Sequence, residues 1–393
     1  MRCLLLILLL LTTTAVPRAK AQDLFVNRVI DVSAPQAVCA AVGDAAGLLV
    51  IGERASTNGH LSLVKLAANG MPEATPPVPL RLELPEPFRA LDVYPRWVRF
   101  HPTLPLLYVW QEVAGPNPDS PEGKAITESF HHLALYAVTN RSLAFIMAWG
   151  HGPVFTYGGE LPLGELLDHT ARRLFLPDLH DPAKNQTALG YFDLDADGRP
   201  VPVSVPIPGT LDGYGLNEFK QELLPTWVNT HQILNPNARP GFLAPTPGTV
   251  IFSCGGTEIG LWDTVNRRGP FGTLSTPVNH WWISGVPGKP HLYAAGSRSL
   301  LQMAQTDGYF TLLPQIIEVD NPHNNFNLPP VVMTGRPTAL FAGMTRQLAA
   351  IPLQADGTFA GPVQLRQYKD TPPRAVAAST RFNRVYVITG TKQ

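Results

Sequence analysis

The chain carries LYAAGSRSLLQMAQTDG at residues 292–308 and nearly restates it as LFAGMTRQLAAIPLQADG at residues 340–357. Both copies consist of short apolar runs that end in a turn, without the spacing of an amphipathic helix. A repeat of about 40 to 50 residues made of short strands and turns is typical of the blades of a β-propeller. We therefore expect an all-β chain. This architecture does not by itself predict an activity, because unrelated functions share it.

Two markers of the repeat recur along the chain. The first is a turn that leads into a strand with an aromatic or aliphatic pair, and the second is a downstream hairpin turn that usually contains Asn-Gly or Asp-Gly. A seventh copy of the first marker must lie between Phe175 and Tyr293, with either Phe242 or Phe252 as its aromatic residue. The other copies of the first marker are residues 43–50, 101–109, 169–176, 287–293, 336–341 and 381–387.

The last blade is incomplete, because the chain ends at Gln393 soon after Tyr386. The segment Asp23–Val32 precedes the first complete blade and can supply the missing strand. Closure of the ring in this way leaves no open sheet edge. The sequence therefore predicts a seven-bladed β-propeller whose last blade is closed by an N-terminal strand.

The first residues have the pattern of a secretory signal peptide. Arg2 precedes the apolar run Cys3–Leu11, and Ala19-Lys20-Ala21 supplies small residues for cleavage. We expect residues 1–21 to be this signal peptide and residues 22–393 to form a single propeller domain, in a secreted or periplasmic protein. The apolar run is shorter than the about 20 residues that a transmembrane helix needs, so we expect no membrane insertion.

The charge composition narrows the classes of partner. The 30 Lys and Arg residues balance the 30 Asp and Glu residues, and only 15% of the chain is charged. A balanced charge gives no basic footprint for nucleic acid, so we expect none to bind. We expect a monomer that binds a small-molecule or protein ligand on one propeller face.

Only Cys39 and Cys254 follow the signal peptide. The blade count places them in the first and fourth blades, whereas a disulfide needs Cα atoms within about 7 Å of each other. We therefore predict two buried free thiols.

Three insertions, residues 113–130, 178–188 and 206–225, interrupt the repeat. Long loops on a repeated scaffold often carry binding function, and surface decoration is an equally good interpretation. The sequence lacks the common motifs of serine hydrolases, zinc proteases and phosphate-binding loops.

The segment Asp193-x-Asp195-x-Asp197-Gly198 resembles the first half of a calcium loop. Its twelfth position is Ser204, where calcium loops require glutamate, and it coincides with the hairpin turn of the repeat. We interpret it as that turn, and we expect neither a metal nor a cofactor.

One stretch resembles a known family in detail. Residues 95–102 read PRWVRFHP and residues 107–112 read LYVWQE. This resembles the lactonase-like seven-bladed propellers, which include 6-phosphogluconolactonase-type and cycloisomerase-type enzymes, in which Pro-Arg-His, Phe-His-Pro and Tyr-Val with Asn-Glu follow one another. Arg96 and Glu112 hold the matching positions, while Trp97 replaces the family's His and Gln111 its Asn.

The resemblance implies that Arg96 and Glu112 handle an anionic lactone or a lactonising acid. An arginine can hold a carboxylate or phosphate bidentately, and a glutamate can act as general acid or base on the ring C–O bond. The alternative from the residues alone is an ion pair that only joins neighbouring strands.

Further candidate binding residues are Trp97, His231, His280 and Trp281. The two histidines fall at or near expected innermost strands, where side chains can face the central channel. Because neighbouring residues of a strand point to opposite faces, only one of Trp281 and Trp282 can line that channel. Two hypotheses follow: an exported lactonase-like enzyme, or a non-catalytic propeller that binds a carbohydrate, peptide or envelope protein.

Overall fold

The computed structural model describes most of the chain after its first residues. The described ranges are 23–55, 58–83, 92–114, 129–154, 167, 172–181, 186–201, 226–228, 242–243, 249–253, 258–263, 268–275, 282–285, 289–296, 298–306, 309–318 and 325–390. Regular structure in these ranges is β-strand, and no helix long and apolar enough to cross a membrane occurs in them. The predicted signal peptide lies outside them and stays a prediction.

The described strands form seven sheets, which we number as blades in chain order and describe from the innermost strand outward. Blade 1 contains β2 (Ala37–Gly43), β3 (Leu48–Arg54), β4 (Gly59–Lys65) and β5 (Val78–Arg81). Blade 2 contains β6 (Asp92–Phe100), β7 (Leu106–Ala114), β8 (Ser129–Thr139) and β9 (Ser142–Val154). Blade 3 contains β10 (Arg173–Asp181), β11 (Gln186–Asp193) and β12 (Thr226–Val228), with Leu167 bridged to Leu174 on the inner side of β10.

The remaining blades repeat this order. Blade 4 contains β13 (Phe242–Leu243), β14 (Thr249–Ser253), β15 (Glu258–Asp263) and β16 (Arg268–Ser275). Blade 5 contains β17 (Trp282–Gly285), β18 (His291–Gly296), β19 (Ser299–Thr306) and β20 (Tyr309–Glu318). Blade 6 contains β21 (Val331–Met333), β22 (Ala339–Gly343), β23 (Gln347–Pro352) and β24 (Gln364–Gln367). Blade 7 contains β25 (Pro373–Ser379), β26 (Arg384–Thr389) and β1 (Val29–Ser33).

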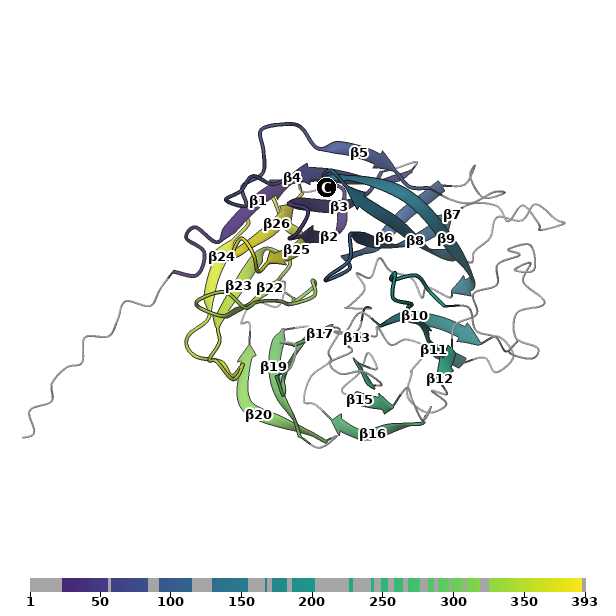
Figure 1. Ribbon diagram of the computed structural model, residues 1–393. Helices are drawn as coiled ribbons and strands as arrows, with labels where there is room; N and C mark the ends of the chain where they lie inside the picture. The colour runs from purple at the N-terminus through teal and green to yellow at the C-terminus, as the bar shows by residue number, and fades with distance from the viewer. Residues whose placement is uncertain are drawn as a thin grey trace, which may run out of the picture.

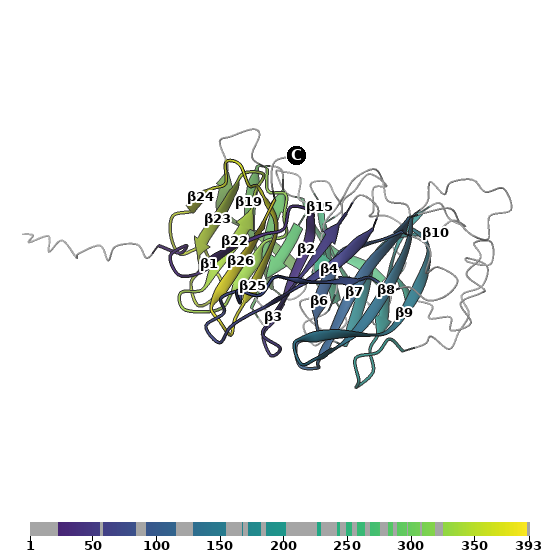
Figure 2. The same cartoon turned by 90° about the horizontal axis from the view of Figure 1, so that it is seen from above.

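The blades follow one another around a ring, which confirms the predicted β-propeller (Figure 1). The innermost strands of neighbouring blades contact each other, as β25 does with β2 and β2 with β6. Seen from its edge, the molecule is a disc whose strands run across its thickness (Figure 2).

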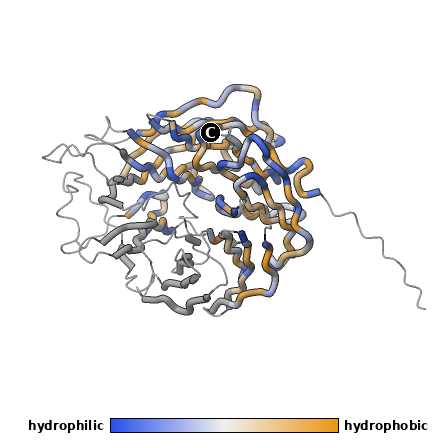
Figure 3. The backbone as a smooth tube through the Cα atoms, turned by 180° about the vertical axis from the view of Figure 1, so that it is seen from behind, coloured by the Kyte–Doolittle hydropathy of each residue, from blue (hydrophilic) through white to orange (hydrophobic). Residues whose placement is uncertain are grey.

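Burial explains the apolar character of the middle strands. Every residue of β22 is buried, because neighbouring blades cover both faces of its sheet. The innermost strand β25 alternates buried and half-buried residues, as expected when one face of a strand is turned to the core. Hydrophobic residues accordingly follow the strands of the ring (Figure 3).

The first sequence marker falls on the second strand of each blade, as in β18 and β22. Phe252 lies on β14, the second strand of blade 4, whereas Phe242 lies on β13 and pairs with Phe252 from the inside. Phe252 is therefore the aromatic residue of the seventh copy.

The second marker forms the turn between the third and fourth strands. In three blades its glycine has a positive φ, 79° for Gly70, 74° for Gly198 and 99° for Gly357, which glycine adopts without strain. Blade 2 instead has two consecutive left-handed residues, Asn140 at 48° and Arg141 at 61°, the pattern of a type I′ turn.

The N-terminal strand closes blade 7, as predicted. β1 pairs with β26 from Val29 opposite Val385 to Ser33 opposite Thr389. The pairing is parallel. It adds a third strand to a sheet for which the C-terminus supplies only two.

The expectation of an inserted loop at residues 178–188 is wrong for most of this range. The β10–β11 ladder continues through Leu179 opposite Ala188 and Asp181 opposite Gln186, so the polar residues extend a hairpin. Polar composition alone does not separate an extended strand end from a loop. The insertion expected at 206–225 lies outside the described residues, and most of that at 113–130 does too.

Cys39 is a free thiol, as predicted, although the residue is half-buried where the sequence predicted a buried one, and Cys254 lies outside the described residues. A Cβ on Gly52 would lie 2.5 Å from Cys39 Sγ, so the thiol packs directly against the β3 backbone. Burial raises the pKa of Cys39 to about 12, partly offset by a hydrogen bond with the Gly52 backbone and by the charge of Arg96.

Candidate functional site

A bulge on the innermost strand of blade 2 sets the direction of Arg96. Pro95 pairs with Gln111 and Trp97 with Trp110, which leaves Arg96 as the extra residue of the β6–β7 ladder. Proline has no N–H to donate to a ladder and is found at such irregularities. A bulge re-aims the extra side chain, and bulges are over-represented beside active sites.

Arg96 contacts the carboxylate of Glu112 on the neighbouring strand. The Arg96 Nε to Glu112 Oε2 distance is 2.5 Å, and the side chains are 11% and 8% exposed. Taking two charges out of water is favourable only when they pair closely, and removing one partner leaves an uncompensated buried charge. Arg96 and Glu112 thus form an ion pair between neighbouring strands, as the alternative from the residues alone expected, and their role in a reaction stays a prediction.

The residues next to this pair along β6 and β7 are buried. Trp97 is 6% exposed, and Trp110 and Gln111 are fully buried. Gln111 Nε2 donates to the backbone carbonyl of Glu83 at 3.4 Å. Burial of the ion pair itself strengthens its electrostatic interaction.

Residues of blade 1 pack against the part of β6 that carries Arg96. The guanidinium of Arg54 lies over the ring of Tyr94, 4.6 Å from its centroid, which is within the range of a cation–π contact. Pro95 lies against the glycine backbone of blade 1, because a Cβ on Gly52 would lie 2.9 Å from its Cβ. Cys39 is close enough to Arg96 for the arginine charge to lower its pKa slightly.

The bulge of β6 recurs on the innermost strands of two adjacent blades. Val38 is the extra residue in blade 1, between Ala37 and Cys39, and Arg374 is the extra residue in blade 7. Blades 7, 1 and 2 are consecutive around the ring (Figure 1). Their inner rim therefore presents one bulged side chain per blade, and two of these are arginines.

The second strands of these blades carry matching positions. The residue that follows the partner of Pro95 is Glu112, and the one that follows the partner of Pro373 is Gly390. In blade 1 the same position holds Arg54, whose N–H donates to the Gln36 carbonyl at 2.9 Å. Among blades 1, 2 and 7, blade 2 alone has a carboxylate at this position.

Of the predicted site residues, the structure brings together Arg96 and Glu112, with Trp97 buried on the same strand. His231, His280 and Trp281 lie outside the described residues and stay predictions. Trp282, beside Trp281, is 3% exposed and belongs to a hydrophobic cluster with Tyr293.

Sequence reasoning missed Arg374. The signal that could have found it is the dipeptide Pro373-Arg374 before an apolar run, which repeats Pro95-Arg96 in blade 2.

The calcium-like segment is a turn, as interpreted from the sequence. Asp195 Oδ1 accepts the N–H groups of Asp197 at 2.9 Å and of Arg199 at 2.8 Å, so this carboxylate oxygen is used within the turn. Among the residues that the structure describes, no group of His, Cys, Asp and Glu is arranged to hold a metal ion.

No family model and no curated protein matches the chain. Solved structures do: the periplasmic gluconolactonase PpgL of Pseudomonas aeruginosa is 15% identical with a TM-score of 0.53, over 88% of this chain and 95% of that one. The C-terminal WD40 domain of Sif2 is 12% identical with a TM-score of 0.51, over 91% of this chain and 94% of that one. Raptor of Chaetomium thermophilum is 10% identical with a TM-score of 0.51, and the 92% of this chain that matches spans 29% of Raptor. At these identities the likeness shows the propeller fold.

Proposed function

We propose that the chain is an exported, lactonase-like propeller that hydrolyses or forms a small organic lactone at Arg96 and Glu112. The observation that carries the proposal is the ion pair itself, a contact of 2.5 Å at the bulge of an innermost strand. The propeller fold of a periplasmic gluconolactonase is compatible with it.

Each residue has a distinct role in this reaction. Arg96 holds the anionic group of the substrate or the carbonyl oxygen on which charge develops. Glu112 accepts a proton from a water molecule whose oxygen attacks the acyl carbon. The acyl C–O bond of the ring then breaks, and Glu112 returns the proton to the ring oxygen, which gives the hydroxy acid.

Hydrolysis of gluconolactone and of its 6-phosphate by the wild type, Arg96→Ala and Glu112→Gln tests the proposal. We expect both variants to lose at least about a hundredfold in kcat/KM, which is typical of removing a general acid–base group. Arg99→Ala is the matched control, because Arg99 is an exposed arginine of the same strand. Equal rates for the wild type and both site variants would refute catalysis at this pair.

The second candidate is a non-catalytic propeller that binds a carbohydrate, peptide or envelope protein. The longest connection of blade 2 along the sequence runs from Ala114, the end of β7, to Ser129, the start of β8, and Glu112 lies two residues before Ala114. Long loops on one face of a repeated scaffold suit such binding. An inactive wild type that binds a ligand through this face would favour this candidate.

A further inference from the structure

Arg374 occupies on blade 7 the position that Arg96 occupies on blade 2. Both arginines follow a proline on an innermost strand, and both are the extra residue of a bulge. Both are partly exposed. The two blades therefore present an arginine in the same way relative to their own sheets.

The residue that faces the arginine differs between the two blades. Blade 2 has Glu112, whose carboxylate contacts Arg96. Blade 7 has Gly390 at the matching position, with its N–H donating to the Pro372 carbonyl at 3.1 Å. Blade 7 thus keeps the cation and omits the carboxylate.

Gly390 allows the backbone to approach Arg374 closely. A Cβ on Gly390 would lie 3.0 Å from Arg374 Nε and 3.2 Å from its Cγ, and also 3.0 Å from the Pro35 carbonyl oxygen. These separations are shorter than ordinary van der Waals contact. A Cβ here would require Arg374 or the Pro35 carbonyl to shift by a few tenths of an ångström.

Arg374 has an unsatisfied donor. Its Nε is buried without a hydrogen-bond partner, and in the described part of the chain no carboxylate pairs with its guanidinium. Burying a charged donor without a partner is unfavourable. An anion at this position would remove the penalty.

We propose that Arg374 binds the carboxylate or phosphate group of a small molecule at the inner rim between blades 7 and 1. A guanidinium holds either group through parallel N–H···O hydrogen bonds. The bound anion takes in blade 7 the place that the Glu112 carboxylate takes in blade 2. This site does not depend on lactone chemistry at Arg96.

Calorimetric titration of the full-length mature chain with inorganic phosphate and with gluconate, at low ionic strength, tests the site. We expect the wild type to bind at least one of them and Arg374→Gln to bind it about tenfold more weakly or worse, since a charge-assisted contact is lost. Arg298→Gln is the matched control, because Arg298 is exposed on blade 5. Stronger binding of gluconate would identify a carboxylate ligand, and stronger binding of phosphate a phosphoryl ligand.

Gly390→Glu provides the complementary test. It supplies the carboxylate that blade 2 has, so we expect it to abolish anion binding while Arg374 is retained. If this variant does not fold, the anion affinity of Arg374→Gln alone tests the proposal. The unfolding midpoint of Arg374→Gln, compared with that of the wild type, shows that this variant is folded. The proposal is overturned if the wild type binds neither anion, or if folded Arg374→Gln binds as the wild type does.

Discussion

The hydroxyl of Tyr386 donates a hydrogen bond to the backbone carbonyl of Gly70 at 2.6 Å, which joins the last blade to the first. The same contact joins other neighbours: Tyr108 donates to the Gly198 carbonyl at 2.6 Å, and Tyr293 to the Gly357 carbonyl at 2.5 Å. In each case the tyrosine lies on the second strand of one blade and the glycine in the third-to-fourth-strand turn of the next. Both sequence markers of the repeat thus meet at blade junctions.

Tyr386→Phe should lower the free energy of unfolding by about 1 kcal/mol or somewhat more, because it leaves a buried carbonyl without its donor. The measurement is urea unfolding followed by tryptophan fluorescence. Tyr94→Phe is the control, since the structure gives its hydroxyl no hydrogen bond among the described residues. Equal midpoints for Tyr386→Phe and the wild type would contradict a stabilising role of the contact.

Departures from this contact have structural reasons. Blade 6 has Phe341 at the third residue of its second strand. The described strands of the next blade are β25, β26 and β1, with no turn from a third to a fourth strand among them to accept a hydroxyl. Blade 1 has Val50 at the same position. At this junction Arg141 of blade 2 instead donates hydrogen bonds to blade 1.

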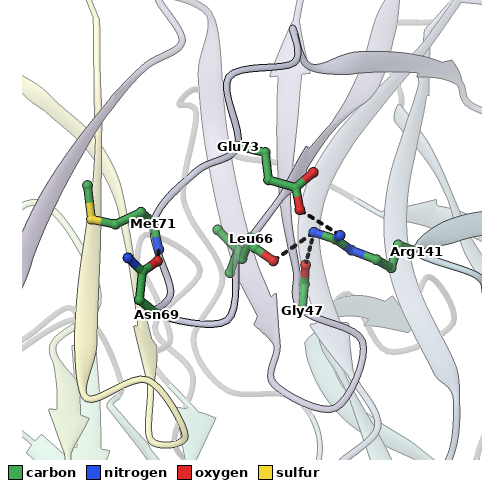
Figure 4. Close-up of polar contacts among 6 residues, drawn as sticks. All are labelled: Gly47, Leu66, Asn69, Met71, Glu73 and Arg141. Atoms are coloured by element: carbon green, nitrogen blue, oxygen red, sulfur yellow. Dashed lines mark hydrogen bonds and ion pairs between the residues drawn. The ribbon is translucent and has the colours of Figure 1, made fainter.

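Arg141 extends from the turn of blade 2 to blade 1 (Figure 4). Its guanidinium contacts Glu73 Oε1 at 2.7 Å, the Leu66 carbonyl at 2.7 Å and the Gly47 carbonyl at 3.3 Å. Three acceptors from one blade are thereby joined to the next by one side chain.

Arg141→Ala should therefore destabilise the chain by about 1 to 2 kcal/mol. Arg141→Lys should recover only part of this, since an ammonium does not reproduce the planar fork of the guanidinium. Both values come from urea unfolding, with Arg298→Ala as the exposed control. Full recovery by lysine would show that charge alone accounts for the effect.

Removal of the N-terminal strand should lower the melting temperature sharply. Besides its pairing with β26, the strand is held to blade 6 by Asp31, which accepts hydrogen bonds from Arg366 and, at 2.7 Å, from the hydroxyl of Tyr368. Deleting residues 22–33 exposes an edge of blade 7 and removes these contacts.

The deletion is compared by calorimetry with the mature chain. Asp31→Asn keeps the strand and weakens only its polar contacts. Its melting temperature should therefore lie between those of the deletion variant and the mature chain. An unchanged melting temperature on deletion would contradict closure by the N-terminus.

The turns and the apolar second strands made the fold predictable, because glycine at positive φ and fully buried strands leave clear patterns in the chain. The parallel pairing of β1 was not predictable, since the alternation of VIDVS fits either direction. The resemblance of residues 95–112 to lactonase-like propellers singled out Arg96 and Glu112, and an ion pair between neighbouring strands was the alternative from the residues alone. Pro373-Arg374 repeats Pro95-Arg96 and so marks the position of Arg374, but its role was not predictable, because the residue that faces it is Gly390 and a glycine at a strand end has many uses.

The thiol of Cys39 should react only when the protein unfolds. Its pKa of about 12 lies above the ordinary thiol value, so at pH 8 the folded protein contains very little thiolate, which is the reactive form. Iodoacetamide followed by peptide mass mapping should label Cys39 in denaturant and leave it unlabelled under native conditions.

Because the folded pKa of Cys39 is raised, the thiol contributes stability that is complete below about pH 9 and is lost as the pH rises toward 12. Cys39→Ala should accordingly show a weaker decline of unfolding free energy over this interval than the wild type, by about 1.4 kcal/mol per pH unit at most. Labelling of the native protein at pH 8 would show that the thiol is accessible. An identical alkaline decline of the free energy of unfolding in the wild type and Cys39→Ala would contradict the raised pKa.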